Sequence, residues 1–231
     1  MTIRLLLILL LAASPASADD DYQALAEKAI EAISQDFGRY WAFTETRLEE
    51  DVLWIGRYDP RRPEDERWQL ISVDGREPND DEIEEYLDDQ DEPEDSGDNK
   101  VEAMVQADTL KLVEETAEHW LFEFVPDGDD DNFLAHVNAT MKIVKADEPY
   151  VTYVDLRSNK AFKPAMGVKL KEFLTRLTFA PVDADGPVVP HSVDVKVRGR
   201  AFLVISFDET VSIRYSDYEY VNDDSPVSRD L

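Results

Sequence analysis

Most of this chain alternates apolar and polar residues with a period of two, which is the pattern of a half-buried β-strand. In SVDVKVR (192–198) three valines occupy one face of the expected strand, and in EHWLFEFV (118–125) one Trp and two Phe do the same. Successive side chains of a strand point to opposite faces of its sheet. The pattern therefore predicts a sheet with one apolar face that other parts of the chain must cover.

About ten strands are expected, joined by short turns such as Asp74-Gly75. The parity of the apolar residues changes within 168–179, which predicts a β-bulge near Phe173 or a short helix there. The expected strands are 41–48, 52–58, 67–73, 109–115, 118–125, 133–146, 150–157, 168–179, 192–198, 201–207 and 211–220. We expect 181–190 to be a loop and Gly199 to mark a turn.

Two segments have helical spacing instead. Residues 20–37 place apolar side chains at i, i+3 and i+4, and a shorter segment after Pro78 does so around Tyr86. The expected fold class is α+β. A single, strongly curved antiparallel sheet forms a half-open barrel, and the long N-terminal helix and the short internal helix cover its concave face.

Residues 1–18 have the features of a signal peptide: Arg4, the apolar run 5–13 and an A-x-A cleavage site at 16–18. A membrane anchor is the alternative, but the apolar run is much shorter than the roughly 20 residues that a membrane span needs. The chain contains no cysteine, so we expect no lipid anchor and no disulfide framework. These features predict a soluble periplasmic protein.

The mature chain is expected to begin at Asp19 and to form one domain over 19–221. Residues 88–100 are expected to form a flexible acidic loop, and 222–231 a polar tail.

The formal net charge of −28 repels nucleic acid and anionic membrane surfaces. It predicts a monomer without a nucleic-acid partner and without a transmembrane segment in the mature chain. The acidic surface could serve a basic protein partner in the envelope, or it could be an adaptation to salt-rich surroundings.

The sequence contains no GxSxG motif, no cysteine nucleophile and no Gly-rich phosphate loop, so we expect neither an enzyme nor a cofactor. In DGDDDN (127–132) three Asp occupy positions one, three and five of an EF-hand loop, but Asn132 and Asn138 replace the required Gly and Glu. We interpret this run as a solvated turn. The three His have no metal-binding spacing, so no metal is expected either.

The large aromatic residues on two expected strands have two interpretations. They form the core under a helix, or they line an apolar cavity inside the curved sheet. Under the second interpretation the candidate ligand-binding residues are Trp54, Tyr58, Trp120, Phe122 and Phe124.

The stretch GRYDPRRPEDERWQLISVDGREP (56–78) contains several Arg in an acidic chain. Arg61 and Arg62 precede Glu64-Asp65-Glu66, so the local charge nearly cancels, and two prolines stiffen the connection. We interpret it as a rigid link between two strands, and as a binding site only if its Arg side chains point into the concave face.

Two parts of the chain carry a resemblance to a known family. The string Tyr58-Asp59-Pro60, Arg62-Pro63, Arg67-Trp68-Gln69-Leu70, Asp74-Gly75, Pro78 resembles uncharacterised bacterial members of the LolA/LolB-like superfamily of periplasmic lipoprotein-sorting carriers. The stretches AFKPAMGVKLKEFLTRLTFAPV and GRAFLVISFDETVSIRYSDYEYV are similar to the same group. With the order of the elements, the resemblance covers nearly the whole expected mature chain.

This resemblance implies a half-open curved sheet whose apolar face accepts acyl chains. We therefore expect an exported carrier of a hydrophobic ligand such as a lipid or a lipoprotein acyl chain. The alternative is an acidic protein-interaction module that has no cavity ligand.

Overall fold

The computed structural model describes residues 18–33, 37–90, 101–126, 133–158, 160–184, 186–202 and 205–221. Residues 1–17 of the expected signal peptide, 91–100 of the acidic loop, DGDDDN and the polar tail lie outside these residues. Within the described ranges, no helix has the length and apolar character needed to cross a lipid bilayer.

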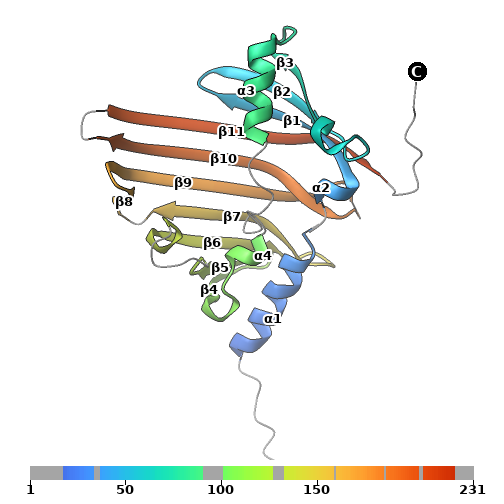
Figure 1. Cartoon of the computed structure of the whole chain (residues 1–231). Helices are drawn as coiled ribbons and strands as arrows, with labels where there is room; N and C mark the ends of the chain where they lie inside the picture. Colours follow the sequence, from blue (N-terminus) through green and yellow to red (C-terminus); the bar gives the residue numbers. More distant parts are fainter. Residues whose placement is uncertain are drawn as a thin grey trace, which may run out of the picture.

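The described chain forms a single open antiparallel sheet of eleven strands (Figure 1). The strands are β1 (Trp41–Glu49), β2 (Val52–Tyr58), β3 (Trp68–Val73), β4 (Lys111–Glu115), β5 (His119–Phe124), β6 (Val137–Val144), β7 (Tyr150–Ser158), β8 (Phe162–Ala165), β9 (Val168–Pro181), β10 (Val188–Ala201) and β11 (Ile205–Tyr220). The α-helices are α1 (Ala18–Glu31), α2 (Phe37–Tyr40), α3 (Asp80–Gln90) and α4 (Val101–Met104). Short 3₁₀ turns are η1 (Glu64–Glu66), η3 (Ala107–Thr109) and η4 (Phe133–His136).

The sheet is not one continuous meander. Its order is β3-β2-β1-β11-β10-β9-β7-β6-β5-β4, with β8 paired to β9. The first strand thus pairs with the last one in the interior of the sheet, while β3 and β4 lie at opposite edges. The alternation within a strand specifies which of its faces is buried but not which strand lies beside it.

Several expected boundaries were wrong. The predicted helix over 20–37 ends at Glu31, and Phe37 begins the separate helix α2. Asp88 to Gln90 are the last residues of α3 rather than part of the acidic loop. The expected loop at 181–190 is shorter, because β9 continues to Pro181 and β10 begins at Val188.

Gly199 does not form a turn; it lies inside β10, and the chain turns after Ala201. A Cβ atom at Gly199 would lie 2.4 Å from Cζ of Phe207 and 2.6 Å from the carbonyl oxygen of Lys169. Close packing, not a turn, thus requires this glycine. The neighbouring β9–β10 register shifts between Arg198 and Gly199, which places a bulge at Lys171 and confirms the expected bulge near Phe173.

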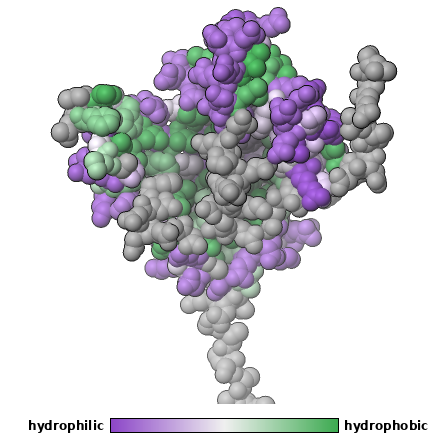
Figure 2. All heavy atoms as spheres, viewed as in Figure 1, coloured by the Kyte–Doolittle hydropathy of each residue, from purple (hydrophilic) through white to green (hydrophobic). Residues whose placement is uncertain are grey.

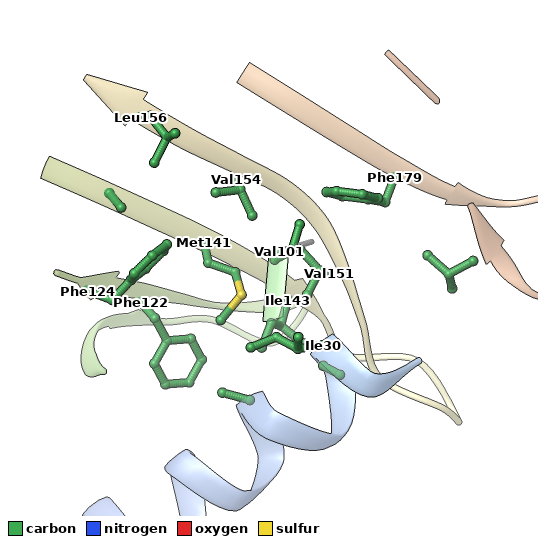
Figure 3. Close-up of a cluster of buried hydrophobic side chains, with 14 residues drawn as sticks. Ile30, Val101, Phe122, Phe124, Met141, Ile143, Val151, Val154, Leu156 and Phe179 are labelled. Carbon is green, nitrogen blue, oxygen red and sulfur yellow. The ribbon is translucent and has the colours of Figure 1, made fainter. Parts of the chain in front are cut away.

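Helix α1 closes a core at one end of the sheet. Its side chains Ala26, Ala29 and Ile30 pack with buried residues of β5, β6, β7 and β9 (Figure 3). At the other end, α3 packs on β3. Both helices lie on the same face of the sheet (Figure 1), which we call the helix-bearing face.

Helix α3 begins with a reciprocal cap. The side-chain Oδ1 of Asn79 accepts a hydrogen bond from the Glu82 N–H at 3.0 Å, and Oε2 of Glu82 accepts one from the Asn79 N–H at 2.9 Å. Glu82 also forms an ion pair with Arg76. The hydrogen bond from Arg76 has the largest effect on the pKa of Glu82, and with the bond from the Asn79 N–H it lowers this pKa to about 2. The helix start is therefore specified locally.

The Arg-rich connection between β2 and β3 forms a rigid link to β11. Arg61 donates hydrogen bonds to Asp59 at 2.8 Å and to Glu219 at 2.8 Å. Arg57 donates to the carbonyl oxygen of Asp217 at 2.9 Å. Gly56 lies under α3 on the helix-bearing face. Neighbouring residues of a strand point to opposite faces, so Arg57 points away from the helix-bearing face. These contacts support the structural interpretation of this stretch.

Candidate ligand-binding face

A row of directly opposed residues crosses ten strands on the helix-bearing face. Opposed residues in antiparallel strands share a face, so the row can be followed from strand to strand. From β4 to β3 it contains Leu112, Phe122, Met141, Val154, Leu177, Val193, Ile213, Arg47, Trp54 and Val73. The helix-bearing face is therefore apolar across almost its whole width, and Arg47 is the charged member of the row.

Within the described residues, α1 and α3 pack against the two ends of this row. Met141 and Val154 near α1 are fully buried, and so is Val73 near α3. Between them, seven apolar side chains of β9, β10 and β11 are only half-buried, whereas Phe179 of β9 is buried in the core under α1. We call these residues the floor: Phe173, Leu177, Val193, Val195, Val197, Val211 and Ile213. Figure 2 shows hydrophobic surface on this face at the level of the central strands.

The five aromatic residues predicted to bind ligand share the helix-bearing face but form two groups. Trp54 and Tyr58 lie on β2, whereas Trp120, Phe122 and Phe124 lie on β5. Six residues of the row separate Phe122 from Trp54, which corresponds to roughly 30 Å at about 4.8 Å per strand. They therefore do not line one common pocket.

The β5 group belongs largely to the core under α1. Phe122 and Phe124 are 1% and 4% exposed, and both join the buried cluster (Figure 3). Trp120 is half-buried at its margin, where its indole N–H donates to Glu115 at 3.1 Å and the Lys145 ammonium lies 4.4 Å from the ring centroid. The structure thus places this group in the arrangement expected for a covered core.

The β2 group surrounds the contact between the sheet and α3. Tyr86 of α3 lies over Gly56, where a Cβ atom would come within 1.9 Å of the Tyr86 hydroxyl oxygen. The rings of Trp54 and Tyr86 stack with centroids 6.5 Å apart. Tyr58 stacks on Phe43 at 5.1 Å, and its hydroxyl donates to the Gly38 carbonyl oxygen at 2.6 Å. Trp54 and Tyr58 therefore help to hold α3 and α2 at the edge of the floor.

A buried polar cluster joins the floor to α3. Arg47 adjoins Ile213 in the row, and its Nη1 donates to Asp89 of α3 at 2.8 Å. Its guanidinium carbon lies 5.2 Å from the Tyr86 ring centroid, and its buried Nε has no hydrogen-bond partner in the described part of the chain. A buried donor without a partner costs about 1–3 kcal/mol, so an acceptor placed there would be favourable.

Glu45 lies next to Arg47 along the same face of β1 and is 4% exposed. Burial raises the pKa of Glu45, and the charge of Arg47 opposes that shift. Sequence reasoning missed this pair, although two charged residues at inward positions of the strand WAFTETRLE were a visible signal. The arrangement suits an amphipathic ligand, because the floor can cover an apolar tail while Arg47 can donate to a polar head.

The described residues contain no group of three His, Asp or Glu side chains placed to hold a metal ion. His119 contacts Thr116 and Glu114 at 3.0 Å each, and the His136 ring packs 4.8 Å from that of Phe162. These two histidines thus have ordinary structural contacts.

Comparison of the chain with protein-family models, curated proteins and solved structures finds no match. The resemblance to the lipoprotein-sorting carriers therefore stays a prediction.

Proposed function

We propose that this protein is an exported, non-catalytic carrier that binds a hydrophobic ligand, such as a lipid or a lipoprotein acyl chain, in a half-open barrel of the LolA/LolB type. The observation that carries the proposal is the floor, a half-buried apolar surface on β9, β10 and β11 between the parts of the sheet covered by α1 and α3. Contiguous apolar surface of this kind is typical of binding sites.

The ligand would lie across the central strands, with its tail on Leu177, Val193 and Ile213. Covering a half-exposed Leu, Val or Ile contributes about 1 kcal/mol, so several such contacts add up to a useful affinity. Because Arg47 lies beside Ile213, a fatty acid is expected to bind more tightly than a fatty alcohol of the same chain length.

Two measurements test the proposal. Organic extraction of the purified protein followed by mass spectrometry is expected to release a lipid, and a fluorescent fatty acid is expected to bind and to be displaced by unlabelled fatty acid. If the extract contains no lipid and the fluorescent probe does not bind, the proposal is wrong.

The chain offers a matched pair of variants on one strand. Leu177 and Leu174 are both half-buried on β9, but Leu177 opposes Val193 on the floor while Leu174 opposes Lys196 on the other face. Leu177→Ser is expected to weaken binding of the fluorescent fatty acid about tenfold, and Leu174→Ser to leave it unchanged. Equal effects of the two variants would show that the probe binds elsewhere.

The second candidate function is an acidic protein-interaction module without a cavity ligand. Helix α3 favours it, because seven of its eleven residues, DDEIEEYLDDQ, are acidic. A pull-down from envelope extract at low and high salt tests it, because a partner held by these charges must be released by salt. An empty pull-down, or one insensitive to salt, counts against this candidate.

A further inference from the structure

One end of the sheet is basic, whereas the rest of the protein is acidic. Residues 157–171 (RSNKAFKPAMGVKLK) contain five Lys and Arg, residues 196–207 (KVRGRAFLVISF) contain three more, and neither stretch contains an acidic residue. These 27 positions thus hold a third of the 24 Lys and Arg of the chain, whereas the remaining positions hold all 52 acidic residues. A net charge of −28 conceals this local excess of positive charge.

The fold brings the two basic stretches together at the same end of the sheet. The first contains the turn between β8 and β9, and the second contains the turn between β10 and β11 (Figure 1). Lys169 lies directly opposite Arg200 in the β9–β10 register. Lys196 and Arg198 pair with Glu172. The other six cations of these stretches have no ion pair within the described residues: Arg157, Lys160, Lys163, Lys169, Lys171 and Arg200.

The same end exposes large apolar side chains. Met166 is 98% exposed, Phe202 71% and Ile205 58%, which makes this the densest group of exposed large hydrophobic residues among those described. Figure 2 shows hydrophobic surface at this end of the molecule as well. Soluble domains rarely expose such residues together unless the surface has a partner.

Backbone geometry holds the two turns side by side. The Phe202 N–H donates to the Gly167 carbonyl oxygen at 2.7 Å, and the Phe202 ring lies against Gly167, where a Cβ atom would come within 3.1 Å of it. Phe202 has a φ of 48°, a left-handed conformation that is costly for a bulky residue and that Asn or Gly would adopt more readily. The turn itself does not favour Phe at this position. We therefore attribute the Phe to a role of its exposed side chain.

We propose that this hairpin tip, made of Lys163, Met166, Lys169, Arg200, Phe202 and Ile205, docks the protein on an anionic lipid surface. The exposed apolar side chains would enter the interface between head groups and acyl chains, and the cations would contact the anionic head groups. The acidic remainder does not prevent this, because charges farther than about 10 Å from the surface are largely screened at physiological salt.

A lipid surface fits the tip better than an acidic protein does. Met166 and Phe202 lie on two neighbouring turns at the end of the sheet, Ile205 begins β11, and all three side chains are exposed. A fluid bilayer can accept projecting side chains without a complementary pocket, whereas a protein partner would have to supply one. This proposal does not depend on a ligand on the floor.

The test is co-sedimentation of the purified protein with vesicles of phosphatidylcholine alone or mixed with phosphatidylglycerol. Binding is expected to the mixed vesicles and to fall at high salt. A triple variant is expected to weaken vesicle binding about a hundredfold at low salt, because each cation contributes about fivefold. Its substitutions are Lys163→Gln, Lys169→Gln and Arg200→Gln. The matched control is Lys28→Gln, Arg62→Gln and Lys111→Gln, three exposed cations elsewhere, which are expected to leave binding unchanged.

The apolar part is tested separately. Phe202→Asn, which suits the left-handed turn, together with Ile205→Ser is expected to weaken vesicle binding at least tenfold. The control, Ile71→Ser with Val125→Ser, changes two residues of similar exposure elsewhere and is expected to have no effect. Circular dichroism of each variant checks that it folds.

The absence of cysteine allows a direct readout on the folded protein. An environment-sensitive dye attached to Met166→Cys is expected to shift to shorter emission wavelengths on anionic vesicles, whereas a dye on Ala146→Cys, at the opposite end of the strands, is not. No binding to mixed vesicles, or no shift at position 166, overturns the proposal. If polyglutamate displaces the protein and the Phe202→Asn, Ile205→Ser variant binds normally, the tip recognises an acidic polypeptide instead.

Discussion

The contact between Gly56 and Tyr86 determines how α3 sits at the edge of the floor, and it can be tested by a double-mutant cycle. The fully buried Tyr86 ring occupies the space above Gly56. A Cβ atom added at position 56 would meet the Oη, Cζ and Cε1 atoms of Tyr86 at 1.9, 2.5 and 3.2 Å. Gly56→Ala should therefore push Tyr86 out of its place between Trp54 and Trp68.

The expected cost follows from this overlap. Overpacking of a buried site costs about 1–3 kcal/mol, and the closeness of two of the three contacts places Gly56→Ala near the upper end of that range. Tyr86→Leu removes the three overlapping atoms and alone costs about 2–4 kcal/mol through the cavity that it leaves. In that background Gly56→Ala is expected to cost nothing, or to stabilise by about 0.5 kcal/mol, because glycine weakens a strand.

Urea unfolding followed by tryptophan fluorescence measures all four proteins, and Trp54 and Trp68 lie close enough to Tyr86 to report on it. The two substitutions are expected to couple by about 2–3 kcal/mol, with unchanged m-values. If their costs add within about 0.5 kcal/mol, the ring does not occupy the space above Gly56 and the placement of α3 is wrong.

Three further predictions concern stability. Asn79→Ala removes the cap of α3 and is expected to lower the free energy of unfolding by about 1 kcal/mol in urea titrations, whereas Asn79→Asp should retain most of it. Burial raises the pKa of Glu45 from 4.5, so the folded state holds this proton more tightly than the unfolded state, and ionisation costs stability as the pH rises above 4.5. Glu45→Gln is therefore expected to stabilise the protein at pH 8 and not at pH 4, and a stabilisation that is equal at both pH values would contradict this. Phe122→Ala is expected to cost about 3–5 kcal/mol, and a cost below 1 kcal/mol would show that the core under α1 is not packed as described.

Local sequence patterns were sufficient for much of the fold. The period-two alternation predicted the main strands and which of their faces is buried. The parity change in 168–179 predicted a bulge or a short helix near Phe173, and the structure has a bulge at Lys171. These features succeed because the backbone of a single strand imposes them, whatever lies beside it. The aromatic residues were likewise assigned to the apolar face of the sheet.

The candidate site was harder to predict, because it depends on the position of each strand in the sheet. Trp54 and Phe122 have the same local pattern, yet the pairing of β1 with β11 places six residues of the row between them. The floor consists of Val, Leu, Ile and Phe residues that no local feature distinguishes from core residues. Their partial burial depends on where α1 and α3 pack on the sheet, which the local pattern does not specify.

For the hairpin tip, too, some features follow from the sequence and others only from the tertiary structure. The absence of acid from 157–171 and from 196–207 was present in the sequence and could have been found by a search for charge runs, but a single net charge averages it away. Only the tertiary structure places Lys169 opposite Arg200 and the Phe202 ring on Gly167. The sequence by itself thus determined the strands, their apolar face, the helix cap and the charge of each segment, because these depend on neighbours along the chain. The tertiary structure decided which strands meet, which part of the apolar face is only half-buried and which exposed residues lie together, because these depend on contacts between residues far apart in sequence.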